Sequence, residues 1–254
     1  MGAVVSSITR MGTIEPFDLQ VARGQVAWHS TVNIYGVQGA STGGTSYYPA
    51  WENIASYSYP NSAVVMTVAS ASGATDAGVK VQVQGLDANY EPLVETVTLN
   101  ASGTVNTTGS FLRINAMLIT SGNNAGIVTA KNAGITYAQI SAGFGRTQMS
   151  IYTVPAGYTF YLQRIQAFTS FNGSDSKYAV YRNYNVSSAG VVSLTQQAPF
   201  VNSYETRRVM PRPFTEKTDI QLQGRASDAT TYFISISAEG YLIQNDVLTT
   251  QSGQ

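Results

Sequence analysis

Short stretches in which apolar and polar residues alternate run along most of the chain and predict β-strands. Residues 79–84 place three valines on one face and lysine or glutamine on the other. Residues 95–99, 158–163 and 232–239 alternate in the same way. A period of two residues is typical of strands that bury one face and expose the other. No window shows the period of about 3.6 residues that indicates an amphipathic helix.

Turn-forming residues separate these stretches at short intervals, which favours antiparallel strands joined by hairpins. We therefore predict an all-β chain of two β-sandwich or jelly-roll domains preceded by an extended N-terminal arm. The predicted boundaries place the arm and its loops at residues 1–60, the first sandwich at 61–145 and the second, jelly-roll-like sandwich at 146–254. Gly143 and Gly145, on either side of Phe144, are the predicted joint between the sandwiches.

Composition excludes several classes of protein. The 254 residues contain no cysteine and one histidine, so disulfide scaffolds, thiolate metal sites and most histidine-based catalysis are excluded. Fourteen basic and fourteen acidic residues give a net charge of zero, which argues against nucleic-acid binding. Charged residues make up 11% of the chain, against about 25% in typical soluble domains. We expect no cofactor, no metal, no membrane association and no secretory signal.

Three features could carry chemistry, and each has a simpler structural interpretation. His29 follows Trp28 and is expected to be a hydrogen-bonded or interface histidine beside a buried tryptophan. Residues 87–91 place oxygen side chains at alternate positions but lack the glycine and the second acid of a calcium loop. That segment is expected to be a turn. Carboxylate pairs are scarce, and no motif supports a glycosidase pair.

A cluster of aromatic residues within the predicted arm is the main sign of binding. Tyrosine and tryptophan are favoured anchors of protein interfaces and of sugar-stacking sites. The cluster leads to three hypotheses: an arm that lies on a partner, packing on its own sandwich, or a glycan site. The candidate interface residues here are Tyr47, Tyr48, Trp51, Tyr57 and Tyr59.

The densest group of basic residues is the second candidate interface. It consists of Arg207, Arg208, Arg212 and Lys217, with two prolines between them. One hypothesis is that these arginines form forked contacts with carboxylates of a neighbouring subunit. The other is a solvated loop whose charges are balanced by nearby glutamates. Both remain open at this point.

Several short motifs resemble a family of virion structural proteins from tailed bacteriophages, particularly marine ones. They span most of the chain, and none of them is a chemical motif: residues 15–25 (EPFDLQVARGQ), 83–91 (VQGLDANYE), 95–100 (ETVTLN), 111–115 (FLRIN), 147–157 (TQMSIYTVPAG) and 214–219 (FTEKTD). The resemblance implies a β-rich particle component that is present in many copies and has no catalytic activity. Because no targeting segment is visible, we expect the protein to be made in the host cytoplasm before it enters the virion.

From the resemblance and the composition we expect a non-enzymatic virion protein that decorates or cements the capsid exterior. Its expected partners are copies of itself, for example in a trimer, and the major capsid or tail protein. Alternatives are a tail- or fibre-associated protein and a module that binds carbohydrate or a host receptor. Low net charge fits an assembly role, since it limits repulsion between adjacent copies.

Overall fold

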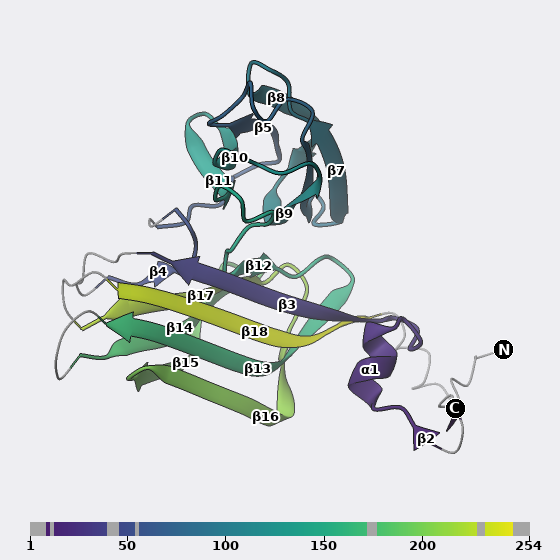
Figure 1. Ribbon diagram of the computed structural model, residues 1–254. Coiled ribbons are helices and arrows are strands. Elements are labelled where there is room, and N and C mark those ends of the chain that lie inside the picture. The colour runs from purple at the N-terminus through teal and green to yellow at the C-terminus, as the bar shows by residue number, and fades with distance from the viewer. Residues whose placement is uncertain are drawn as a thin grey trace.

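The computed structural model describes residues 9–10, 13–39, 46–53, 56–171, 177–227 and 232–245. Within those ranges the elements are strands, apart from one short helix, α1 (Phe17–Ala22). Two short strands, β1 (Thr9–Arg10) and β2 (Thr13–Ile14), pair with each other before this helix. The other strands form two β-sandwiches, one above the other in Figure 1. The predicted all-β fold with sandwich domains is confirmed.

The first sandwich, at the top of Figure 1, packs a four-stranded sheet on a three-stranded sheet. The strand orders are β11-β10-β5-β8 and β7-β6-β9, and all pairs are antiparallel. On β6, Val81 and Val83 are fully buried and Lys80 is exposed, as the alternation predicts. Phe111 and Met117, from the two sheets, complete the same core. The strands are β5 (Val64–Ser70), β6 (Lys80–Leu86), β7 (Pro92–Thr98), β8 (Thr104–Phe111), β9 (Arg113–Ser121), β10 (Val128–Asn132) and β11 (Ile135–Ile140).

The second sandwich is built from longer strands. One sheet has the order β16-β13-β18-β3, and the other has the order β12-β17-β14-β15, with β4 paired to β17. Phe160 and Leu162 on β13 pack in one core with Tyr181 on β14 and Leu222 on β17. The strands are β3 (His29–Gln38), β4 (Tyr48–Pro49), β12 (Ile151–Thr153), β13 (Tyr158–Phe171), β14 (Ala179–Val186), β15 (Val192–Phe200), β16 (Ser203–Phe214), β17 (Asp219–Ala226) and β18 (Tyr232–Gln244).

The position of β3 differs from the prediction of an extended arm over residues 1–60. All ten residues of β3 pair with β18, and Ile34 is buried in the core of the second sandwich. The chain therefore begins this sandwich, leaves it to form the first sandwich, and returns at β12. Sequence alternation did not reveal the strand because a glycine, Gly36, occupies one of its positions. A Cβ atom there would lie 1.9 Å from the carbonyl oxygen of Ala50.

The two sheets of the second sandwich are joined by backbone contacts along one side, called the closed side. Along the other side, called the open side, their edge strands are not paired with each other. On the closed side, Tyr35 of β3 forms a bridge with Met149, and the Val37 N–H donates to the Gln148 carbonyl at 3.4 Å. The open side lies between the edge strands β15 and β16. Figure 1 shows these two strands on the side of the second sandwich farthest from the first sandwich.

A buried ion pair joins the two sandwiches. The Arg113 guanidinium on β9 donates from Nε and Nη2 to the two carboxylate oxygens of Asp219 on β17, at 2.8 and 2.9 Å. The two residues are 8% and 7% exposed. Thr153 also donates its hydroxyl to Asp219 at 2.6 Å, and the ring of Tyr59 lies 4.4 Å from the guanidinium carbon. Burial acts to lower the pKa of Arg113, but Asp219 outweighs it and holds that pKa above its ordinary value.

A second buried carboxylate, Asp76, organises the loops at the edge of the first sandwich. Its oxygens accept hydrogen bonds from the N–H groups of Ala125 and Gly126 at 2.7 and 3.1 Å, and from the Ser70 hydroxyl. Burial acts to raise the pKa of Asp76, but these three hydrogen bonds outweigh it and hold the pKa below its ordinary value.

Acid is therefore expected to destabilise the protein through Asp76. The folded state binds this proton less tightly than the unfolded chain, so the stabilisation is complete above the unfolded pKa of about 3.9 and is lost as the pH falls below it. Urea unfolding measured at a series of pH values should give a shallower acid limb for Asp76→Asn than for the wild type. An identical slope in both proteins would contradict this role.

Candidate interaction surfaces

The aromatic residues predicted as an interface lie mostly against the chain itself. Trp51 is 2% exposed in the core of the first sandwich, which corrects its assignment to an exposed interface. Tyr57 packs edge-on against Trp51, and Tyr59 packs edge-on against Tyr57, with ring centres 5.2 and 5.0 Å apart. The Tyr57 hydroxyl donates to the Tyr137 carbonyl at 3.0 Å. Burial raises the pKa of both Tyr57 and Tyr59. These rings are anchors of the fold.

Tyr47 and Tyr48 have different surroundings. Tyr48, on the short strand β4, pairs with Gly224 and is half-buried. The ring of Tyr47 lies under the guanidinium of Arg182, whose carbon is 3.9 Å from the ring centre. The guanidinium carbon of Arg225 is 5.1 Å from the same centre. Tyr47 therefore contacts two guanidinium groups, whereas Tyr59 of the same cluster contacts the Arg113 guanidinium of the buried ion pair.

The predicted basic cluster is divided among three places. Arg207 points toward Asp18, with 3.9 Å between Nη2 and the carboxylate oxygen. Arg208 and Arg212 reach across the open side to β15, where they donate to the Gln196 side chain at 2.6 Å and the Thr195 carbonyl at 2.9 Å. Successive residues of a strand point to opposite faces, which separates Arg207 from Arg208.

Lys217 lies apart from these arginines, at the turn between β16 and β17. Its ammonium is 5.9 Å from the ring centre of Tyr90, which belongs to a turn of the first sandwich. The backbone φ of Lys217 is +60°, a value typical of a tight turn. Lys217 therefore lies near the joint between the sandwiches and not beside the arginines.

Sequence analysis missed a bulge in β16 that exposes two apolar side chains. Leu162 of β13 pairs with Arg212, and Arg164 pairs with Arg207. Residues 208–211 of β16 are therefore opposite a single residue of β13 and protrude from the ladder. Val209 is 100% exposed and Met210 is 84% exposed. In the sequence, the only sign of this exposed apolar surface is the pair Val209 and Met210, which lies among arginines and prolines.

The neighbouring edge strand β15 has no charged side chain. Val192 and Leu194 on this strand are 54% and 55% exposed, and Val201, just after it, is 60% exposed. Edge strands of soluble proteins usually carry charged residues or bulges that block pairing with another chain. On β15 the blocking features are Pro199 and a bulge at Thr195, whose carbonyl already accepts from Arg212. The open side of the second sandwich thus presents an apolar bulge beside an edge strand with exposed apolar side chains and no charge.

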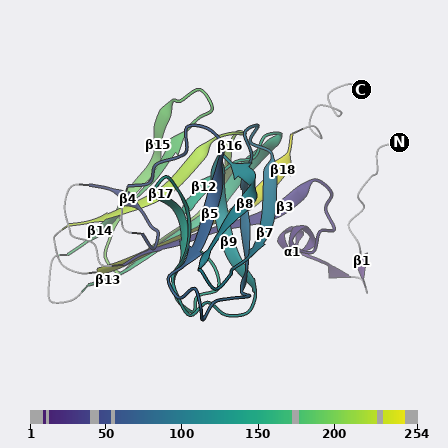
Figure 2. The same cartoon turned by 90° about the horizontal axis from the view of Figure 1, so that it is seen from above.

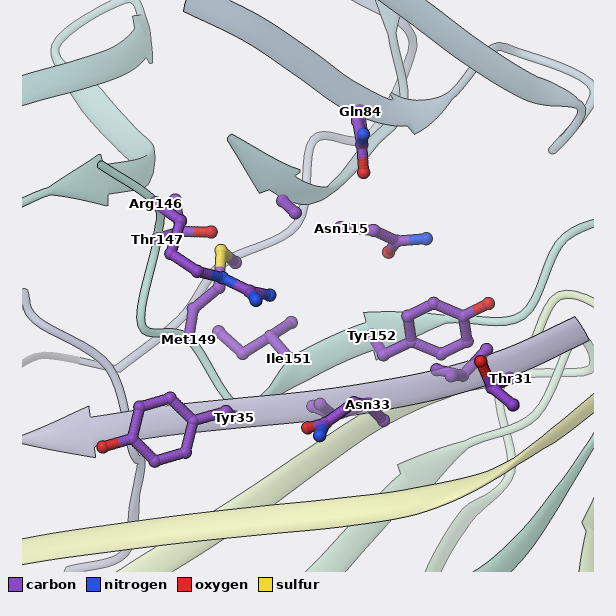
Figure 3. A pocket seen from close by; sticks show the side chains of 13 residues that line it. Thr31, Asn33, Tyr35, Gln84, Asn115, Arg146, Thr147, Met149, Ile151 and Tyr152 are labelled. Carbon is purple, nitrogen blue, oxygen red and sulfur yellow. The ribbon is translucent and has the colours of Figure 1, made fainter. Parts of the chain in front are cut away.

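A cavity of about 210 Å³ lies at the seam between the sandwiches, and Figure 3 shows the side chains around it. Asn33 and Tyr35 of β3 line one wall, and Gln84 and Asn115 of the first sandwich line the opposite wall. Asn115 is already bonded to the backbone of Thr153, through its amide N–H at 3.0 Å and its oxygen at 2.9 Å. The lining contains no histidine or carboxylate, and the volume is below the roughly 300 Å³ of typical ligand pockets.

The other candidate chemical groups have structural roles. The Nδ1 atom of His29 is 2.8 Å from the Ala27 carbonyl, which confirms a hydrogen-bonded histidine. The expectation that Trp28 beside it is buried is wrong, because this side chain is 57% exposed. Asp87 accepts hydrogen bonds from the N–H groups of Asn89 and Glu91, which confirms the turn. Within the described ranges no group of three or more His, Asp or Glu side chains could hold a metal ion. In the same part of the chain no helix is long and apolar enough to cross a membrane.

Comparisons with known proteins identify no family. No protein-family model and no curated protein matches the chain. Structures of infectious bursal disease virus show a weak similarity. A chain from the structure of the Gt strain of that virus is 11% identical in sequence to this chain. The match covers 85% of this chain and 72% of that chain, with a TM-score of 0.21. The VP2 subviral particle of that virus is 12% identical, with the same coverage and a TM-score of 0.24. Such low TM-scores do not establish a shared fold.

Proposed function

We propose that this chain is a non-enzymatic structural protein of a virus particle, which decorates or cements the capsid exterior through protein–protein contacts. The apolar bulge at Val209 and Met210 on an open sandwich edge is the observation that carries the proposal. Exposed apolar groups concentrated at one site indicate a surface that a partner covers. The sequence motifs that resemble phage virion proteins are the reason for placing the protein in a virus particle.

The bulge is suited to contact because the strand on either side of it is fixed. Arg208 is tied to Gln196 and Arg212 to the Thr195 carbonyl, so the segment between them is anchored at both ends. A preordered surface loses little conformational entropy on binding. Full burial of a side chain such as valine or methionine contributes about 1.5–3 kcal/mol. Two such side chains per copy can drive attachment in a protein with few charges.

The position of the bulge also supports a decorating role. The open edge of the second sandwich lies on the side away from the first sandwich, as Figure 1 shows. A copy attached by this edge would hold its first sandwich outward as a projecting body. Bound glycans, by contrast, need free aromatic faces, whereas Trp51 and Tyr57 pack on the chain itself. The predicted aromatic cluster thus gives the glycan alternative less support than the bulge gives protein attachment.

The proposal is tested by counting copies in purified particles. Quantitative mass spectrometry should find on the order of hundreds of copies per particle if the protein decorates a symmetric capsid. About ten copies or fewer would instead favour the tail- or fibre-associated alternative. Absence of the protein from particles would overturn the proposal.

A double substitution tests whether the bulge makes the contact. Val209→Asp with Met210→Asp should lower the occupancy of particles at least about tenfold, which corresponds to about 1.4 kcal/mol. Folding should not change, since both side chains are largely in solvent. Val94→Asp is the matched control, because Val94 is 57% exposed on the first sandwich. Full occupancy with the double variant would exclude the bulge as the attachment site.

A further inference from the structure

Two arginines and a tyrosine converge on the outer face of the sheet that contains β14 and β17. Arg182 belongs to β14 and Arg225 to β17, and Tyr47 precedes β4. Their guanidinium carbons lie 3.9 and 5.1 Å from the ring centre of Tyr47. Val180 pairs with Arg225 and Arg182 pairs with Gln223, so the arginines are diagonal neighbours on one face. Two like charges held this close repel each other unless an anion lies between them.

No carboxylate balances this pair within the described part of the chain. The Nε atom of Arg182 donates to the Gln223 side chain at 2.6 Å, and its two terminal nitrogens have no hydrogen-bond partner among the described residues. The Nε atom of Arg225 is buried and has no hydrogen-bond partner among the described residues. Burial lowers the pKa of Arg182, and the positive charge of Arg225 acts in the same direction. Tyr47 contributes a ring face and no negative charge.

An apolar stripe continues from the arginines along the same face. Tyr184, two residues after Arg182, pairs with Leu194, and Val186 pairs with Val192. Paired residues of adjacent strands lie on the same face of a sheet, so these four side chains share the face of Arg182. Leu194 and Val192 are more than half exposed. The outer face thus combines two forked donors with adjacent apolar surface.

We propose that this face binds a segment of a neighbouring protein that carries carboxylate side chains beside apolar ones. Each guanidinium has two adjacent donors that match the two oxygens of one carboxylate. Leu194 and Val192 cover the apolar side chains of the segment. The inference rests on the proposed function, because a particle supplies a fixed neighbour at high local concentration. This docking face would be a second contact surface besides the bulge, and its two arginines are not among the interface residues predicted from the sequence.

Binding is measured with a defined probe, a fluorescein-labelled peptide of alternating glutamate and leucine, and its glutamine counterpart. Fluorescence anisotropy should show saturable binding of the glutamate peptide that weakens as salt rises. Arg182→Gln and Arg225→Gln should each weaken this binding at least about tenfold. Arg164→Gln is the matched control, because Arg164 is paired with Glu205 at 2.9 Å and its loss removes the same charge elsewhere.

Three results would overturn the inference. The glutamine peptide could bind as well as the glutamate peptide, Arg182→Gln and Arg225→Gln could bind like the wild type, or inorganic phosphate but not acetate could displace the probe. The last result would assign the arginines to phosphate groups and not to a protein segment.

Particle counting separates this inference from the proposed function. If the protein is present in particles and the two arginine variants reach full occupancy, the docking face is wrong while the structural role stands. If the protein is absent from particles but the glutamate peptide binds through Arg182 and Arg225, the structural role fails and the carboxylate site remains.

Discussion

Replacing Arg113 with alanine is expected to lower the free energy of unfolding by about 3–5 kcal/mol, the typical cost of breaking a buried ion pair. The substitution leaves the Asp219 carboxylate buried, with only the Thr153 hydroxyl at 2.6 Å to stabilise its charge. It also removes the guanidinium hydrogen bonds to the carbonyls of Pro60 and Leu112, at 3.2 and 2.9 Å. The loss falls on the joint between the sandwiches, so both sandwiches should lose stability. Urea unfolding followed by tryptophan fluorescence measures the change.

An exposed arginine provides the control for Arg113. Arg164 pairs with Glu205 and Glu239 on the outer surface of the second sandwich, with separations of 2.9 and 3.7 Å. Surface ion pairs contribute about 0–1 kcal/mol, so Arg164→Gln should have little effect. If Arg113→Ala costs no more than Arg164→Gln, the pair is hydrated and does not hold the sandwiches together.

Replacing Gly36 with alanine is expected to cost about 3 kcal/mol, the upper end of the usual range for overpacking, because the added methyl group meets backbone that cannot move freely. Its Cβ atom would lie 1.9 Å from the Ala50 carbonyl oxygen and 2.3 Å from the Ser150 nitrogen. Those two atoms form a hydrogen bond of 2.8 Å on the closed side of the second sandwich. Relieving the overlap would break that bond or separate β3 from its neighbours. The change in denaturation midpoint measures the cost.

Gly134 provides the contrast with Gly36. Its φ is +82°, and no heavy atom lies within 4 Å of the position of an added Cβ. Gly134→Ala should therefore cost only the backbone strain of a left-handed residue, about 1–2 kcal/mol. If the two variants are equally stable, the close approach of Ala50 and Ser150 to β3 would be contradicted.

The strands with strict alternation were predictable because burial of one face follows directly from side-chain direction. Of the stretch 79–84, residues 80–84 lie in β6, and residues 158–163 and 232–239 lie within β13 and β18. The strand at residues 29–38 was not predicted, although it pairs over its full length with β18. Gly36 interrupts its pattern, and its partner lies some two hundred residues away along the chain, so no local signal marks it.

The candidate site was predicted only in part. Sequence analysis predicted that the basic residues near position 210 form an interface through their charge. The exposed surface there comes instead from the apolar side chains of Val209 and Met210. Arg208 and Arg212 use their donors within the chain, on Gln196 and Thr195. Whether a segment bulges depends on its pairing with β13, which is a property of the assembled sheet.

Composition and local alternation determined the class of this protein: an all-β chain with few charges, no cysteine and one histidine. Those features depend on each residue and its near neighbours. Only the tertiary structure decided which surfaces remain available. Trp51 became buried, β15 and β16 became an open edge, and Arg182 met Arg225 through strand pairing across forty residues of chain. Contacts of this kind depend on register and on long-range packing, which alternation alone does not specify.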